Sequence, residues 1–225
     1  MSGVRGAEPV GLSGVRGGRA PAWARWGGIA ITVGGALLFV ATLLEVPLAE
    51  AGEPAPGLLA LFTVLFLGSA VAHALSMIAL SGGRTGADGA IGSSVAGRVA
   101  LLGFGGVFLT MQAVYYTVTY ALPPVEDYVG VLMLTLVLGV AQLVLLLVGS
   151  IVIVWVGVAT GSSRWALLAL TVVAIITGVV ANATDSAEVA TVALLCSTGA
   201  QIVVGLVFAT AKGPTAVTSE YGSRV

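Results

Sequence analysis

The residues of this sequence that could carry chemistry are few, and they form no recognised catalytic pattern. The chain has one histidine, His73, and one cysteine, Cys196, which Ser197 follows directly. Hydrolysis needs a nucleophile with a nearby base, or a metal ion. Cys196 or Ser197 could be the nucleophile and His73 the base, but nothing in the sequence brings them together. We therefore expect that the protein is not an enzyme.

The same residue counts exclude several cofactor sites within one chain. A single histidine rules out an HExxH zinc site and bis-histidine haem ligation. A single cysteine rules out a CxxC metal site and an intrachain disulfide. The only lysine, Lys212, lies beyond the last apolar segment, so no lysine is placed for a Schiff base within a membrane. The net charge of −1 gives no reason to expect nucleic acid as a partner, and we expect no cofactor.

Polar side chains inside apolar segments form the second set of candidates, because such groups often mark functional sites in membranes. Gln112, Tyr116 and Tyr120 follow one another at intervals of four residues, which places them on one helical face. This stripe could line a cavity or form a packed seam between helices. His73 could relay protons, or it could pack as a neutral ring. The candidates for a polar cavity or for interhelical contacts are His73, Gln112, Tyr116, Gln142 and Gln201.

Long apolar segments must position these side chains. The chain is 58% hydrophobic and only 8% charged, whereas soluble domains contain about 25% charged residues. Residues 129–159 hold neither charge nor proline and could cross a bilayer core of about 30 Å as a helix. A helix suits lipid because it satisfies its own backbone hydrogen bonds. We therefore predict an all-α, up-and-down bundle of six transmembrane spans, at about 27–47, 58–80, 99–122, 130–158, 165–183 and 188–210.

Two polar tails flank this transmembrane domain, which we place at residues 27–211. Residues 1–26 are rich in Gly and Arg and read as a disordered tail, and residues 212–225 form the C-terminal tail. Each proline is expected in a tail, in a loop or at the edge of a span, and Pro47 is expected to break the first span.

The basic residues predict the orientation in the membrane, because Lys and Arg favour the cytoplasmic side. With six spans, all nine Lys and Arg lie on the side of both termini, and the opposite loops carry acidic residues but no basic ones. We therefore expect a multi-pass protein of the plasma membrane with both termini in the cytoplasm. An alternative is that Arg25, the first apolar segment and Ala49-Glu50-Ala51 form a cleaved signal peptide, which would leave five spans.

A weak internal repeat relates the helical hairpins. Arg25-Trp26 and Arg164-Trp165 each open a similar segment. The polar residue after alanine in Ala72-His73 recurs in Ala141-Gln142 and Ala200-Gln201. The bundle could thus consist of repeated hairpins, or these coincidences could reflect an alanine-rich composition. If the repeat is real, His73, Gln142 and Gln201 point into the bundle and hydrogen-bond to neighbouring helices, with Gln112 and Tyr116 as partners for at least one.

Two functions are compatible with these features. The scarcity of buried charge and the glycines in the first and third spans favour a non-enzymatic assembly, regulatory or accessory subunit, with the bilayer and other membrane proteins or further copies as partners. The polar candidates would instead suit a small transporter or channel for a neutral or apolar solute, provided that they converge on one cavity.

Overall fold

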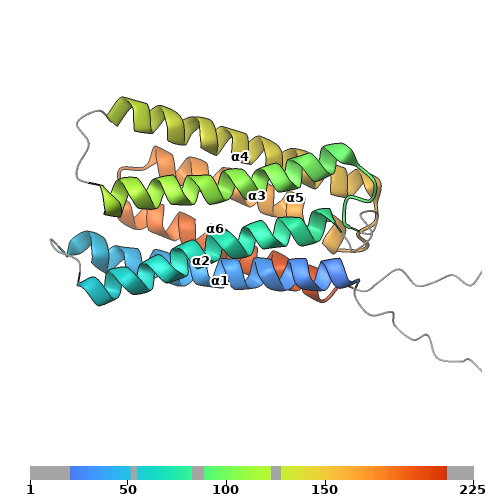
Figure 1. Cartoon of the computed structure of the whole chain (residues 1–225), viewed down its shortest axis with the longest axis horizontal. Coiled ribbons are helices and arrows are strands. Elements are labelled where there is room, and N and C mark those ends of the chain that lie inside the picture. The colour runs from blue at the N-terminus through green and yellow to red at the C-terminus, as the bar shows by residue number, and fades with distance from the viewer. Residues whose placement is uncertain (1–20, 52–54, 83–88, 123–127, 212–225) are drawn as a thin grey trace, which may run out of the picture.

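The computed structural model describes residues 21–51, 55–82, 89–122 and 128–211. Every regular element within these ranges is a helix. The elements are α1 (Ala22–Glu50), α2 (Pro56–Ser81), α3 (Val95–Tyr116) with a π-helical end η1 (Thr117–Ala121), α4 (Tyr128–Val156), α5 (Ser163–Ala183) and α6 (Ala187–Ala209) (Figure 1). All six α-helices are long and apolar enough to cross a membrane, which confirms the predicted six-span bundle.

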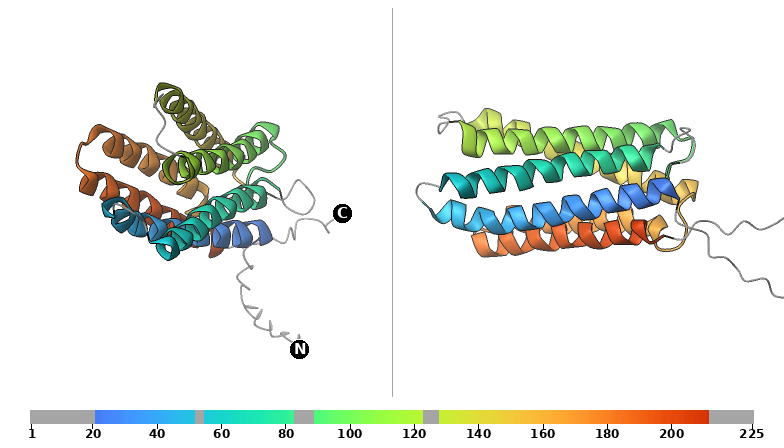
Figure 2. Two further views of the ribbon diagram at one scale, coloured as in Figure 1. Left: turned by 60° about the vertical axis from the view of Figure 1, so that its left-hand side comes forward. Right: turned by 60° about the horizontal axis from the view of Figure 1, so that its bottom comes forward.

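The helices run alternately up and down and follow chain order around a ring (Figures 1 and 2). Each helix packs against its neighbours in sequence, and α1 closes the ring by packing against α6. One end of the bundle therefore holds the beginnings of the odd-numbered helices, with Arg25, Arg98 and Arg164, and we call it the basic end. The opposite end, which we call the acidic end, holds Glu45 and Glu188.

The first helix is longer than the sequence predicted. Residues 22–26, which were assigned to the disordered tail, are already helical in α1. Pro47 lies inside the helix, which continues to Glu50, so the expectation that Pro47 breaks the span is wrong. Pro47 removes one backbone hydrogen bond, to the carbonyl of Leu43 four residues earlier, and the helix continues for only three more residues. The other predicted tail residues, 1–20 and 212–225, lie outside the described residues.

Local side-chain contacts explain several of the helix ends. Ser94 and Ser186 cap α3 and α6, each accepting a hydrogen bond from the backbone N–H three residues later. Pro56 opens α2, where its missing N–H costs nothing. At the end of α4, Nε of Arg164 donates to the carbonyl oxygen of Val154 at 2.8 Å, which satisfies one of the last free carbonyls.

The two halves of the bundle are packed differently. In the basic half, one cluster of buried side chains draws on all six helices, with Trp23, Leu80, Leu101, Ile153, Leu167 and Phe208 among its members. In the acidic half, the buried cluster comes from α1 and α2, with tyrosines of α3 and η1 packed against it. Helix α4 is the least enclosed span. In its most apolar stretch of 18 residues 6% of the residues are buried, whereas the corresponding share in the other spans is 22–28%.

Candidate functional site

Apart from serines and threonines, the buried polar side chain of the described bundle is His73, which is 4% exposed in the second half of α2. Its Nδ1 lies 2.8 Å from the backbone oxygen of Ser69, one turn earlier in the same helix. Its Nε2 lies 2.9 Å from Oε1 of the side-chain amide of Gln201 in α6. The ring of Phe108 in α3 packs against the imidazole, with centroids 5.0 Å apart. One side chain thus joins α2, α3 and α6.

Two adjacent glycines of α1 make room for this bridge. Helices α2 and α6 are not neighbours in the ring, and α1 packs against both. A Cβ placed on Gly34 would lie 2.6 Å from Nδ1 of His73, and one placed on Gly35 would lie 3.1 Å from Cβ of Gln201. The pair Gly34-Gly35 therefore forms a gap in the surface of α1 through which His73 reaches Gln201.

The hydrogen bonds determine the tautomer of His73. A backbone carbonyl only accepts, so Nδ1 must carry a proton and donate it to Ser69. The surroundings offer no counter-ion to an imidazolium, since the groups in contact with the ring are neutral. The neutral ring then accepts at Nε2, so the amide of Gln201 must turn to present its nitrogen in place of Oε1. An amide can take either orientation. Both ring nitrogens are thereby satisfied.

The other two glutamines do not join this bridge. Gln112 and Gln142 are half-buried, and neither side chain has a hydrogen-bond partner among the described residues. Each continues a buried face of its helix: Gln112 follows Phe108 by four residues, and Gln142 precedes Leu146 by four. The expectation that Gln142 hydrogen-bonds to a neighbouring helix is not met within the described part of the chain. The structure thus pairs two of the three equivalent positions of the proposed repeat.

The tyrosine stripe forms a separate cluster at the acidic end. The hydroxyl of Tyr116 accepts a hydrogen bond of 3.0 Å from Thr63 in α2. Tyr115 and Tyr120 both donate to one carboxylate oxygen, Oε1 of Glu45 in α1, the latter at 3.2 Å. Their rings pack against the aromatic rings of α2. Tyr116 therefore contacts Thr63 and Tyr120 rather than His73, Gln142 or Gln201.

The π-helical turn η1 brings the two tyrosine donors together. Residues five apart in a regular α-helix point in directions that differ by about 140°. In the turn Thr117–Ala121 a backbone hydrogen bond instead joins residues five apart, from Leu122 N–H to Thr117 O, and this wider turn brings Tyr115 and Tyr120 to the same carboxylate oxygen. Sequence reasoning missed Glu45 as a partner because the first span was expected to break at Pro47, which would have placed Glu45 at the span's end.

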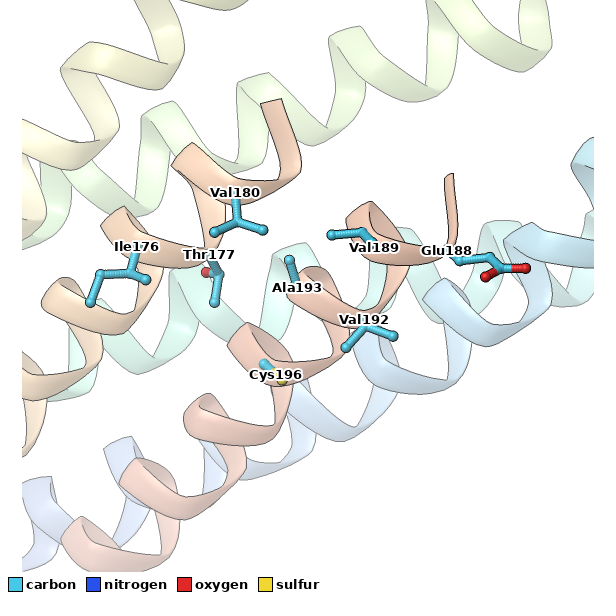
Figure 3. Close-up of a pocket in the computed structure, with 8 residues that line it drawn as sticks. All are labelled: Ile176, Thr177, Val180, Glu188, Val189, Val192, Ala193 and Cys196. Atoms are coloured by element: carbon cyan, nitrogen blue, oxygen red, sulfur yellow. The ribbon is translucent and has the colours of Figure 1, made fainter. Parts of the chain in front are cut away.

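Two grooves on the outside of the bundle contain none of these side chains. One, of about 370 Å³, lies between α5 and α6 and is lined by apolar residues together with Thr177, Glu188 and Cys196 (Figure 3). The other follows α4 and is lined entirely by Leu, Val and Ala. Neither groove includes any of the five polar candidates.

Among the described residues, Cys196 is not a hydrogen-bond partner of His73. Cys196 is exposed in the groove between α5 and α6, whereas both nitrogens of His73 are bonded to other partners. No three His, Cys, Asp or Glu residues of the described chain lie close enough to hold a metal ion. What the arrangement provides is helix-to-helix attachment by hydrogen bonds in a medium where unpaired polar groups are costly.

Comparison with known proteins adds no assignment to this geometry. The sequence matches no family model and no curated protein, and the fold matches no solved structure.

Proposed function

We propose that the chain is a non-enzymatic subunit of a membrane assembly, in which its spans pack against an apolar transmembrane helix of another chain. The observation that carries this proposal is the use made of the polar side chains. His73 and Gln201 are hydrogen-bonded to each other beside Gly34, and Tyr115 and Tyr120 both donate hydrogen bonds to Glu45. These polar groups therefore serve to attach helices to one another. Hydrogen bonds and close backbone approach are the means by which helices associate in lipid.

Helix α4 is the surface that we propose for the partner. It runs for 29 residues without a charged side chain, and it is the least buried span. Its half towards the acidic end leaves Leu132, Leu136, Val137 and Val140 more than half exposed. Within the chain, α4 packs chiefly against α3, and its buried residues lie in its half at the basic end. A partner helix along the exposed face would therefore enclose the rest of this span.

Photo-crosslinking from α4 tests this proposal. Replacing the single cysteine by Cys196→Ala allows one new cysteine, at Val137, to carry a benzophenone label in native membranes. We expect one protein adduct of defined mass, at twice the chain mass if the partner is a second copy. The matched control is a cysteine at Val172, which is also exposed but lies on α5. Lipid adducts alone at Val137, or the same protein adduct from Val172, would contradict the proposal.

The charge distribution supports a plasma-membrane orientation with both termini in the cytoplasm. Arg25, Arg98 and Arg164 lie at the basic end of the bundle, together with Trp23 and Trp165. Basic side chains favour the cytoplasmic side, and tryptophan favours a membrane interface. We therefore place the basic end in the cytoplasm.

A transporter or channel for a neutral solute is the second candidate, and Gln112 and Gln142 are the observation that favours it. Both amides are half-buried on otherwise inward-facing helix surfaces, and neither has a partner among the described residues. A water-filled path past them would let a cysteine at residue 142 react with a membrane-impermeant thiol reagent in a Cys196→Ala background. If the cysteine does not react, packing between helices is the only role that remains for Gln112 and Gln142.

A further inference from the structure

The carboxylate of Glu45 is only partly engaged by the protein. Tyr115 and Tyr120 both donate to Oε1, whereas Oε2 takes no hydrogen bond from the described residues. No side-chain oxygen in the described chain is both buried and without a partner. Since the residue is half-buried, Oε2 must therefore open to the surface of the bundle. It is a free acceptor held in place by two phenols.

None of the basic residues that the structure describes supplies a cation to this carboxylate. Of the nine basic residues, Arg25, Arg98 and Arg164 lie at the opposite end of the bundle. The other six lie outside the described residues. A carboxylate at the edge of lipid is costly without a partner of opposite charge. A cation from outside the described bundle would offset this cost.

The depth of Glu45 indicates what that partner is. Helix α1 has 29 residues, or about 43 Å of helix, which matches a bilayer of about 40–45 Å with its headgroups. Glu45 lies five residues before the end of α1, about 7.5 Å below it. The headgroup layer on each side is about 5–7 Å thick, so the carboxylate lies where headgroups meet hydrocarbon.

The aromatic rings around the carboxylate also suit a cation. Tyr120 packs against Phe62 and Tyr116, with ring centroids 5.0 and 5.8 Å apart, and Tyr115 packs against Phe66. The faces of such rings attract ammonium groups, most strongly where little water is present. A primary ammonium can donate to Oε2 while its alkyl stem lies along the rings.

We propose that Glu45, held by Tyr115 and Tyr120, binds the primary ammonium of an aminophospholipid headgroup, as in phosphatidylethanolamine. A free amine has the same ammonium, but only the lipid is anchored at this depth. A quaternary choline has no N–H to donate to Oε2, so a choline lipid should bind less well. The inference is independent of the subunit role proposed above, because it concerns a lipid at α1 and α3 rather than a protein at α4.

Native mass spectrometry of the purified full-length protein tests the site. The protein is titrated with palmitoyl-oleoyl phosphatidylethanolamine, with the phosphatidylcholine of the same chains, and with free ethanolamine. We expect the ethanolamine lipid to bind about tenfold more tightly than the choline lipid, as the loss of one charge-assisted hydrogen bond predicts. Glu45→Gln should remove this preference, whereas Glu188→Gln, at the same end but away from the tyrosines, should retain it.

Several results would overturn the proposal. Equal binding of the two lipids, or an unchanged preference in Glu45→Gln, would remove the carboxylate from lipid recognition. Displacement of the lipid by equimolar free ethanolamine would make the ligand a soluble amine instead. If Glu45→Gln unfolds, Glu45→Asp is the second variant, because its shorter side chain keeps the negative charge but moves it away from the lipid headgroup. An unaltered lipid preference in Glu45→Asp would contradict the proposed geometry.

Discussion

Gly34 lies directly against the imidazole of His73, so closely that a methyl group on Gly34 would come within 2.6 Å of Nδ1. The two residues are on adjacent helices, α1 and α2, and the ring passes this point to reach Gln201 on α6. A glycine at this position is therefore required by packing rather than by backbone conformation. The helix itself would be better served by alanine.

The first prediction is that Gly34→Ala destabilises the bundle. The added methyl group must displace a ring that is fixed by two hydrogen bonds, and overpacking of this kind costs about 1–3 kcal/mol. Thermal unfolding in detergent measures the loss. Gly139→Ala is the matched control, because nothing lies within 4 Å of a Cβ at Gly139, and a gain of about 0.5–1 kcal/mol in helix propensity is expected there. Equal effects of the two substitutions would contradict this account.

A second prediction concerns the backbones of α1 and α6. A Cβ on Gly28 would lie 2.3 Å from the backbone nitrogen of Ala209. Backbone atoms cannot move aside as a side chain can, so Gly28→Ala should lower the unfolding temperature more than Gly34→Ala does. The double variant Gly34→Ala/His73→Ala offers a further check, because removing the ring should relieve the Gly34 clash and leave the Gly28 clash unchanged.

The third prediction is an energetic coupling between His73 and Gln201. Gln201→Leu leaves Nε2 of His73 without a donor, and His73→Leu leaves the amide of Gln201 without an acceptor. The double substitution removes both groups, so the two single losses should not add. A double-mutant cycle of unfolding free energies should give a coupling of about 0.6–2 kcal/mol, the range for hydrogen bonds between membrane helices. Additive losses would mean that the bond contributes nothing.

The sequence was sufficient to predict the six spans and to identify His73 and Gln201 as inward-facing polar groups, because both follow from hydrophobic length and from the cost of polar groups in lipid. It was not sufficient to predict which polar groups meet. Partners depend on how far one helix slides past the next, and that is set by local features such as Gly34-Gly35. Gln142, like Gln201, follows an alanine and precedes aliphatic residues, yet it lies on the loosely enclosed α4 and has no hydrogen-bond partner among the described residues.

The acidic end shows a second limit of sequence reasoning. The prediction that Gln112, Tyr116 and Tyr120 share one helical face requires a regular α-helix, but the chain changes to a π-turn at Thr117. The turn adds Tyr115 to the face of Tyr120, and the continuation of α1 past Pro47 keeps Glu45 opposite them. Neither departure from regular geometry has a signature in the hydrophobic pattern.

The fourth prediction follows from the shared acceptor of Tyr115 and Tyr120. Tyr115→Phe removes a donor to the carboxylate of Glu45 while keeping the ring, and a hydrogen bond to a charged group contributes about 1.5–3 kcal/mol. Since Tyr120 still holds the same oxygen, the loss should fall near the lower end of that range. The double variant Tyr115→Phe/Tyr120→Phe should lose more than the two single losses together, because it leaves Oε1 with neither donor. Unfolding curves of the three variants measure this difference.

The last prediction concerns orientation. Because Cys196 is the only cysteine, the Cys196→Ala protein can carry one reporter cysteine at either end of the bundle. Ser162 and Asp185 are both exposed, and they flank opposite ends of α5, at the basic and acidic ends respectively. If the basic end is cytoplasmic, a membrane-impermeant thiol reagent added to intact cells should label a cysteine at residue 185 and leave one at residue 162 unlabelled. Permeabilised cells should label both, which controls for reactivity. The expected pattern follows from the resistance of Lys and Arg in short loops to translocation across the membrane. The reverse labelling pattern in intact cells would place the arginines outside the cell and contradict this charge argument.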